Sequence, residues 1–311
     1  MLLIKNIAIL LIGFILLIKG ADYFVDGAAG IADKFGIPQL VIGLTIVAFG
    51  TSAPEAAISI SAALKGSTGI AIGNVIGSNI MNVLLILGIT GCITPLAVAK
   101  STVQFEIPFT IGITAVLVAY GAIFGKLNLV AGIILWVLFL IFFIHLIKVS
   151  RNSEEVVEEG ESEKHSLITL LIFTLGGLVA IVFGSNFTVD GATEIAKFFG
   201  VSDRIIGLTI IAFGTSLPEL ITSVTAAKKG KADIAIGNII GSNIFNILFV
   251  LGTTALIHTV PFASKFIVDG IVAIAAVVIL YGAVYKDGEM GRKAGITMLV
   301  GYAAYFVYLL V

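Results

Sequence analysis

A long stretch of the first half of this chain recurs, without a gap, in the second half. Residues 42–88 align with residues 206–252 at a constant offset of 164, and 31 of the 47 aligned positions are identical. The tetrapeptide VDGA at 25–28 recurs at the same offset, at 189–192. Internal symmetry of this kind predicts two copies of one structural unit.

Both copies are too apolar for a water-soluble domain. Hydrophobic residues make up 59% of the chain and charged residues 12%, whereas a soluble domain carries roughly 25% charged residues. The apolar residues fall into runs of about 20 or more, the length that a helix needs to cross about 30 Å of hydrocarbon. The sequence therefore predicts an all-α, multi-pass protein of the cell membrane.

Dividing the apolar runs at Gly, Pro and charge clusters predicts ten membrane helices. Their predicted spans are 2–24, 38–64, 70–95, 104–124, 129–148, 167–190, 203–227, 233–257, 267–286 and 291–311. The stretch 150–166 is predicted to be an acidic loop between a first five-helix repeat, 1–149, and a second, 167–311. Both repeats belong to one membrane domain.

The odd number of helices in each repeat fixes their relative orientation. The second repeat must enter the bilayer from the opposite side, which gives an inverted repeat. With both termini outside, 12 of the 18 Lys and Arg residues lie on the cytoplasmic side, in agreement with the positive-inside rule. The loop 150–166 then faces the cytoplasm as a solvated linker, with glutamates at 154, 155, 158, 159, 161 and 163.

Two carboxylates are predicted to lie deep in the bilayer. Glu55 and Glu219 are repeat mates inside long apolar segments, whereas the other acidic residues lie in loops or near predicted helix ends. A carboxylate at that depth is costly unless it is paired, protonated or metal-bound, and it indicates a functional site. The structural alternative, a protonated glutamate satisfied by neighbouring helices, does not explain two copies in the same context.

The residues that precede each glutamate predict a broken helix. They read GTSAPE at 50–55 and GTSLPE at 214–219. Proline has no N–H, so each proline releases the carbonyl of the glycine four residues earlier. Free backbone groups are tolerated at membrane depth only where they line a cavity or hold an ion. The second and seventh helices are therefore predicted to be broken.

The polar groups that these motifs bring together are all oxygens. Ca²⁺ and Na⁺ prefer oxygen ligands, whereas a zinc or copper site would need histidine or cysteine. The three histidines, His145, His165 and His258, lie at helix ends or in the loop and are predicted to be solvated. No resident cofactor is expected.

The helix after each glutamate carries a polar stripe. Each stripe holds two asparagines and one serine spaced four residues apart, namely Asn74, Ser78 and Asn82, and Asn238, Ser242 and Asn246. Side chains at this spacing share one face of a helix. Glycines four residues apart, at 73–77 and 237–241, run beside the stripes. They indicate either ordinary tight packing or close approach to the broken helix.

These paired motifs, together with GNVIGSNIMN at 73–82 and GNIIGSNIFN at 237–246, resemble the two α-repeats of the cation/Ca²⁺ antiporter superfamily. The closest resemblance is to prokaryotic Na⁺/Ca²⁺ exchangers, and it covers essentially the whole chain. It implies an antiporter that binds one Ca²⁺ or several Na⁺ alternately at one mid-membrane cluster. It also implies that the first helix of each repeat slides across a core of the other eight.

The resemblance further implies a set of ligands. Ca²⁺ would be held by Glu55, Glu219 and the backbone carbonyls of Thr51 and Thr215. The flanking Na⁺ positions would use Ala48, Ser52, Ser78, Ala212, Ser216 and Ser242. Asn82 and Asn246 would close the centre of the cluster.

One position departs from the pattern of many relatives, which carry aspartate where this chain has Asn246. Two carboxylates neutralise one Ca²⁺ or two Na⁺, so potassium dependence is less expected and a three-to-one stoichiometry does not follow. Asp22, Asp26 and their counterparts Asn186 and Asp190 are predicted to be interfacial, near the ends of the first helix of each repeat. The alternative is that they line an access passage.

Two other transport functions remain open from the residues alone. Buried glutamates can exchange a metal for protons, so a Ca²⁺/H⁺ antiporter is the first alternative, and a passive cation channel is the second. No nucleophile–base pair, phosphate-binding loop or cofactor motif predicts an enzyme, and no basic patch predicts nucleic-acid binding. The expected partners are Na⁺, Ca²⁺ and the lipid bilayer, and no protein partner is implied.

Overall fold

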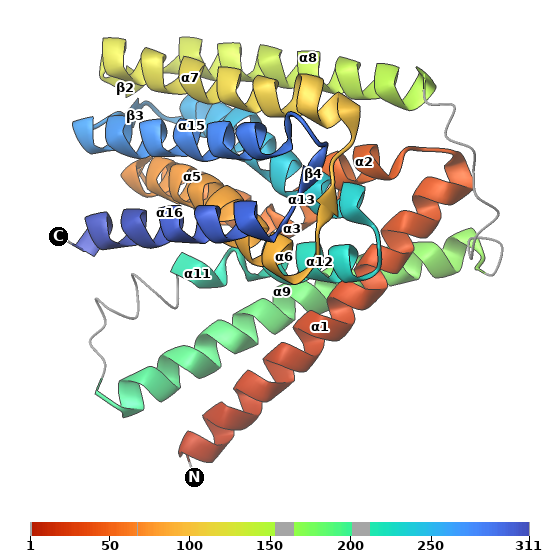
Figure 1. Cartoon of the computed structure of the whole chain (residues 1–311). Coiled ribbons are helices and arrows are strands. Elements are labelled where there is room, and N and C mark those ends of the chain that lie inside the picture. Colours follow the sequence, from red (N-terminus) through yellow and green to blue (C-terminus); the bar gives the residue numbers. More distant parts are fainter. Residues whose placement is uncertain (1, 67, 153–164, 201–211, 311) are drawn as a thin grey trace.

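The computed structural model describes residues 2–66, 68–152, 165–200 and 212–310, which fold almost entirely into helices (Figure 1). The helices of the first half are α1 (Leu2–Phe35), α2 (Gln39–Ile42), α3 (Ala48–Thr51), α4 (Ala53–Leu64), α5 (Thr68–Met81), α6 (Gly88–Ile93), α7 (Ile107–Phe124) and α8 (Leu129–Asn152). Those of the second half are α9 (Leu167–Phe198), α11 (Ala212–Gly214), α12 (Leu217–Lys228), α13 (Ala232–Phe245), α14 (Gly252–Ile257), α15 (Ser264–Val284) and α16 (Arg292–Leu310). Among the described residues, π-helical segments are inserted between them at η1 (Gly43–Val47), η2 (Asn82–Leu87), η3 (Thr102–Glu106) and η6 (Asn246–Leu251).

The helices have the length and composition of membrane spans. Within the described residues, seven are long and apolar enough to cross a bilayer, and an eighth span results if the bent pair 39–51 and 53–64 counts as one. The chain is thus a mostly helical, multi-pass membrane protein, as predicted. The predicted span 203–227 falls partly on 201–211, which lie outside the described residues. The predicted span 291–311 corresponds to α16, which is not among the seven, so the count of ten remains a prediction. The loop glutamates between 154 and 163 also lie outside them.

Short strands in the connections join the two halves. β1 (Leu96–Ala97) pairs antiparallel with β4 (Glu289–Met290), and β2 (Lys126–Leu127) pairs antiparallel with β3 (Val260–Pro261). β2 and β3 lie at the left of the bundle in Figure 1, and β4 lies toward its right. These ladders are the departure, within the described residues, from the all-helical prediction.

The first helix of each half is longer than predicted. The predicted spans 2–24 and 167–190 stop where charged residues interrupt the apolar pattern, but α1 continues to Phe35 and α9 to Phe198. The actual stop signal of α1 is Gly36, whose φ of 62° suits glycine after a helix, followed by a proline two residues later. The charged residues therefore lie within the helix.

Asp22 and Asp26 are accordingly not near a helix end, which corrects the prediction. Lys229, just after α12, donates to the Asp26 carboxylate at 2.8 Å and to the backbone carbonyl of Asp22 at 3.0 Å. The repeat mates of the two aspartates, Asn186 and Asp190, are exposed on α9. The ion pair ties α1 to the end of α12.

α1 and α9 pack against each other and cross the other helices diagonally (Figure 1). Glycines set their separation, because a Cβ added at Gly20 would lie 2.9 Å from the carbonyl oxygen of Gly177. A Cβ added at Gly177 would lie 2.6 Å from the backbone nitrogen of Phe24. Small residues let the two backbones approach closely.

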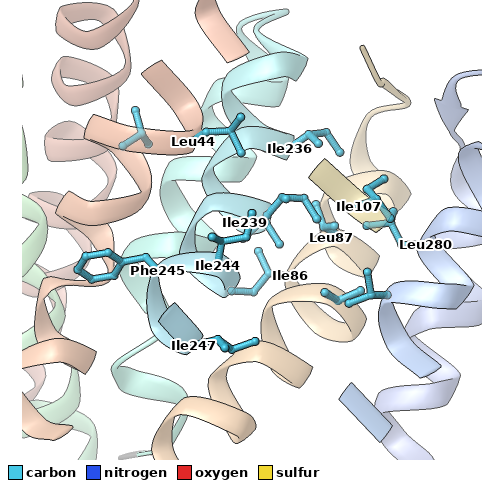
Figure 2. Close-up of a cluster of buried hydrophobic side chains, with 14 of the residues drawn as sticks. Leu44, Ile86, Leu87, Ile107, Ile236, Ile239, Ile244, Phe245, Ile247 and Leu280 are labelled. Carbon is cyan, nitrogen blue, oxygen red and sulfur yellow. The ribbon is translucent and has the colours of Figure 1, made fainter. Parts of the chain in front are cut away.

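The interior of the protein is formed around the helices that carry the polar stripes. In the most apolar window of the span 232–257, 94% of residues are buried, and the figure for 68–93 is 72%. The five other continuous spans among the described residues reach at most 39%, so most of their residues are exposed on the outside of the bundle. Figure 2 shows side chains of η1, η2 and α13, such as Leu44, Ile86 and Ile239, meeting in this core. The polar stripes therefore face protein.

Candidate cation site

The helix that carries Glu55 is interrupted immediately before it. α3 ends at Thr51, Ser52 has a φ of −85° and a ψ of 6°, and α4 begins at Ala53. The two parts are bent by 52°. In the second half, Ser216 separates α11 from α12 with nearly the same backbone angles, −93° and 5°. The part of this helix before Ala212 lies outside the described residues.

The two glutamates meet across the two halves of the chain. Glu55 lies in the first turn of α4 and Glu219 in the first turn of α12, and each is 1% exposed. Ser52 Oγ donates to Glu219 Oε1 at 2.8 Å, and Ser216 Oγ donates to Glu55 Oε1 at 3.5 Å. Each serine thus bonds the glutamate of the other half. The N-terminal end of each helix favours negative charge at this point.

Four buried oxygens at the centre have no hydrogen-bond partner among the described residues. They are Oε2 of Glu55, Oε2 of Glu219, Oδ1 of Asn82 and Oδ1 of Asn246, two pairs of repeat mates. The two asparagines are the first residues of η2 and η6, and π-helical turns are frequent at functional sites. All four oxygens are predicted site atoms, and an ionised carboxylate or an amide oxygen only accepts. Such a group is complementary to a desolvated cation.

The polar stripes face the broken helices. Thr51 Oγ1 donates to Asn238 Oδ1 at 2.9 Å, and Ser242 Oγ lies 3.4 Å from the backbone oxygen of Ala48. In the first half, Asn74 Nδ2 donates to Ser59 Oγ at 3.0 Å. Residues of α3, α4, α5 and α13 therefore take part in these polar contacts.

For the remaining predicted site residues, the structure gives a position in the fold. Ser78 is buried on α5 and borders, together with Asn74, a cavity between α5, α15 and α16. Thr215 lies in the turn between α11 and α12, and Ala212 is the first residue of α11.

The glycine pair 237–241 makes the close approach that the sequence suggested. A Cβ added at Gly241 would lie 2.7 Å from the carbonyl oxygen of Leu44 and 2.8 Å from Cβ of Ala48. A Cβ added at Gly237 would lie 3.0 Å from Cα of Gly43. α13 is thus pressed against the broken helix of the first half.

Asn79 and Asn243, which the sequence reading did not single out, lie between the two site asparagines. Asn79 Nδ2 donates to the backbone oxygen of Asn243 at 3.1 Å, and Asn243 Nδ2 donates to that of Asn79 at 3.2 Å. Asn82 Nδ2 donates to Asn243 Oδ1 at 3.0 Å, and Asn246 Nδ2 donates to Asn79 Oδ1 at 3.2 Å. The sequence signal that could have revealed them is their presence in the repeated GSN tripeptide, at 77–79 and 241–243.

The carbonyl that Pro218 releases has a protein partner, contrary to the expectation that it lines a cavity or holds an ion. Ser185 Oγ, on α9, donates to the carbonyl oxygen of Gly214 at 2.8 Å. The position equivalent to Ser185 in α1 is Ala21, which has no hydroxyl. The bond therefore links α9 to the break in the second half only.

A third buried carboxylate corrects the sequence reading. Glu106 is fully buried, and its Oε1 lies 2.9 Å from Nε2 of His145 on α8. His145, predicted to be solvated, is only 22% exposed and stacks on Phe105. The partners lie 39 residues apart in the sequence and outside the gap-free repeat 42–88. Comparison of the repeats therefore could not reveal the pair.

Comparison with known proteins places this chain in a family. The family model described as sodium/calcium exchanger protein matches residues 5–148 and 169–311. The putative antiporter CaxA of Alkalimonas amylolytica is 39% identical over 95% of both chains. The sodium/calcium exchanger MaX1 of Methanosarcina acetivorans is 34% identical over 98% of both. The sodium-calcium exchanger NCX_Mj, soaked with 2.5 mM Na⁺ and 10 mM Sr²⁺, superposes with a TM-score of 0.86 and 34% identity, covering 98% of this chain and 99% of its own.

Proposed function

Because the chain belongs to the sodium/calcium exchanger protein family, a cation/Ca²⁺ antiporter family, we propose that it drives Ca²⁺ across the membrane in exchange for Na⁺. The observation that carries this proposal is the set of four buried oxygens without partners, on Glu55, Glu219, Asn82 and Asn246. Leaving buried acceptors unpaired costs about 1–3 kcal/mol each, and more for charged groups. A bound cation offsets that cost.

The ligand chemistry favours hard cations. Carboxylate, amide, hydroxyl and carbonyl oxygens are the ligands that Ca²⁺ takes in proteins. We assign Ca²⁺ to Glu55, Glu219 and the carbonyls of Thr51 and Thr215. The assigned Na⁺ ligands are Ala48, Ser52, Ser78, Ala212, Ser216 and Ser242, with Asn82 and Asn246 at the centre. The contacts between Ser52 and Glu219 and between Ser242 and Ala48 support this grouping.

Charge balance couples the two fluxes. Glu55 and Glu219 supply two negative charges, which neutralise one Ca²⁺ or two Na⁺. The two kinds of ion share the same carboxylates, so one must leave before the other binds. Exchange follows if the loaded site opens alternately to the two sides of the membrane. A third Na⁺ would leave a net positive charge in the core, so a stoichiometry of three to one is not part of the proposal.

Alternating access follows from an inverted repeat of five helices in each half. The first repeat spans 1–149, the second spans 167–311, and the loop 150–166 between them lies in the cytoplasm with both termini outside. β1 and β3 occupy corresponding places in the two halves, but β1 pairs with β4 and β3 pairs with β2. The β2–β3 ladder lies away from β4 along the bundle (Figure 1), so corresponding connections lie toward different ends, which supports inverted halves. We assign the moving part to α1 and α9, which pack on each other and lie diagonally across the rest.

Ion gradients imposed one at a time test the proposed coupling. In vesicles that contain the purified protein, an outward Na⁺ gradient should drive ⁴⁵Ca²⁺ uptake. A pH gradient of equal size without Na⁺ should drive none, and added K⁺ should change nothing. Uptake driven by the pH gradient alone would replace the proposal with Ca²⁺/H⁺ exchange. Ca²⁺ flux without any countergradient, far above the turnover of a carrier, would indicate a channel.

A further inference from the structure

Four asparagine side chains form a closed hydrogen-bond network where α5 and η2 meet α13 and η6. Asn82 and Asn246, which we assign to the site, donate their NH₂ groups to Asn243 and Asn79, and their amide oxygens are buried without a partner among the described residues. We infer that Asn79 and Asn243 are positioning residues that fix which end of each site amide faces the cation. The identity of the cation, and with it the use of Ca²⁺ binding as the readout, rests on the proposed function.

The direction of the network is set by two backbone carbonyls. A carbonyl oxygen only accepts, so the atom that faces it must be the NH₂ group of an amide. The carbonyl of Asn243 therefore holds the NH₂ of Asn79, and the carbonyl of Asn79 holds the NH₂ of Asn243. Each of these two side chains must then direct its own oxygen the other way, toward a site asparagine.

The orientation of the Asn82 and Asn246 amides is fixed once the side-chain oxygens of Asn79 and Asn243 are placed. Asn246 must donate its NH₂ to Asn79 Oδ1, and Asn82 must donate its NH₂ to Asn243 Oδ1. Their own oxygens are then two of the buried acceptors that have no partner among the described residues. Flipping either amide would place an N–H donor at the cation and an oxygen against an oxygen. The network therefore makes two neutral side chains act as acceptors only.

The hydrogen bonds of Asn79 and Asn243 run to the site asparagine of the other half of the chain. A positioning role therefore predicts coupling between residues of different halves, whereas simple packing does not. Asn79 acts on Asn246, 167 residues away, and Asn243 acts on Asn82, 161 residues away. Asn79 and Asn82, although neighbours on one helical face, share no hydrogen bond that joins their side chains directly. Replacing Asn79 leaves the backbone carbonyl that holds Asn243, so the other arm of the network stays in place.

Double-mutant cycles on Ca²⁺ binding test this assignment. We expect Asn79→Ala to weaken ⁴⁵Ca²⁺ binding to the purified protein about tenfold, the upper range for one lost hydrogen bond between neutral groups, and to have little further effect in an N246A background. In the matched control cycle, the effects of N79A and N82A should multiply. The mirror cycle of N243A with N82A should repeat the coupling, which keeps the test open if N79A does not fold.

The outcomes separate this inference from the proposed function. Effects of N79A that multiply with N246A as they do with N82A would overturn it, as would a lower melting temperature with unchanged Ca²⁺ affinity. Wild-type protein that binds Ca²⁺ without exchanging it for Na⁺ would overturn only the proposed function. Wild-type protein that binds no Ca²⁺ would overturn both.

Discussion

Replacing either buried glutamate with glutamine is expected to abolish Na⁺-dependent ⁴⁵Ca²⁺ uptake in vesicles. Glu55 and Glu219 supply the only charges assigned to the site, and each is 1% exposed. Removing one partner of a buried set of charges costs about 3–5 kcal/mol, which corresponds to a loss of at least about 100-fold in Ca²⁺ affinity. Glutamine keeps the shape and the serine hydrogen bond, so folding should survive.

The matched control for these variants is Glu289→Gln. Glu289 is an exposed glutamate on β4 and is not among the residues assigned to the site. Its variant should transport Ca²⁺ like the wild type. Near-normal uptake by E55Q or E219Q, in protein that is folded and inserted, would remove the carboxylates from the mechanism and the proposed site with them.

Adding a single methyl group at Gly241 is expected to impair both stability and transport. The new Cβ of Gly241→Ala would lie 2.7 Å from the Leu44 carbonyl oxygen and 2.8 Å from Cβ of Ala48. The helices must then separate, and overpacking of this kind costs about 1–3 kcal/mol. Ala48 lies one turn before the break, so the shift reaches the site. We expect a lower melting temperature and slower Na⁺-driven uptake.

Gly112→Ala provides the comparison for this variant. Gly112 lies on the outward face of α7, and no described atom comes within 4 Å of an added Cβ. Alanine favours a helix over glycine by roughly 1 kcal/mol, so G112A should be as stable as the wild type or more so. Equal melting temperatures and equal uptake for G241A and G112A would contradict the close packing of α13 on the broken helix.

Most of the proposed site residues could be predicted from the sequence because they lie in the repeated motifs. Glu55 and Glu219 are recognisable because a carboxylate inside an apolar helix has few explanations and here occurs twice. The proline that follows Gly, Thr and Ser predicts the break, and spacing by four predicts the polar stripe. Each of these signals is local, within about two helical turns.

Interactions between distant helices were not predictable in the same way. The bond between Ser185 and Gly214 joins two elements through a residue that one repeat lacks. The pairing of Glu106 with His145 depends on how α7 and α8 lie together. Asn79 and Asn243 were overlooked because they lie off the stripe that the spacing by four defines. Their role depends on the crossing of α5 and α13.

The helix ends show a different limit. The hydropathy reading ended the first helix at 24, two residues before Asp26, although α1 continues to Phe35. Hydropathy indicates which residues lie within the hydrocarbon layer of the bilayer, whereas glycine and proline indicate where the backbone hydrogen bonds of the helix end. Gly36 and Pro38 were visible in the sequence, so weighting them above charge would have given the correct end.

The most direct test of the central claim, that Ca²⁺ and Na⁺ compete for one site, is displacement of bound ⁴⁵Ca²⁺ from the purified protein by increasing Na⁺. We predict one Ca²⁺ per chain, displaced by Na⁺ with a Hill coefficient of about 2 or more because more than one Na⁺ replaces it. Choline at the same ionic strength should leave it bound. Ca²⁺ that remains bound in Na⁺ as firmly as in choline would contradict a shared site.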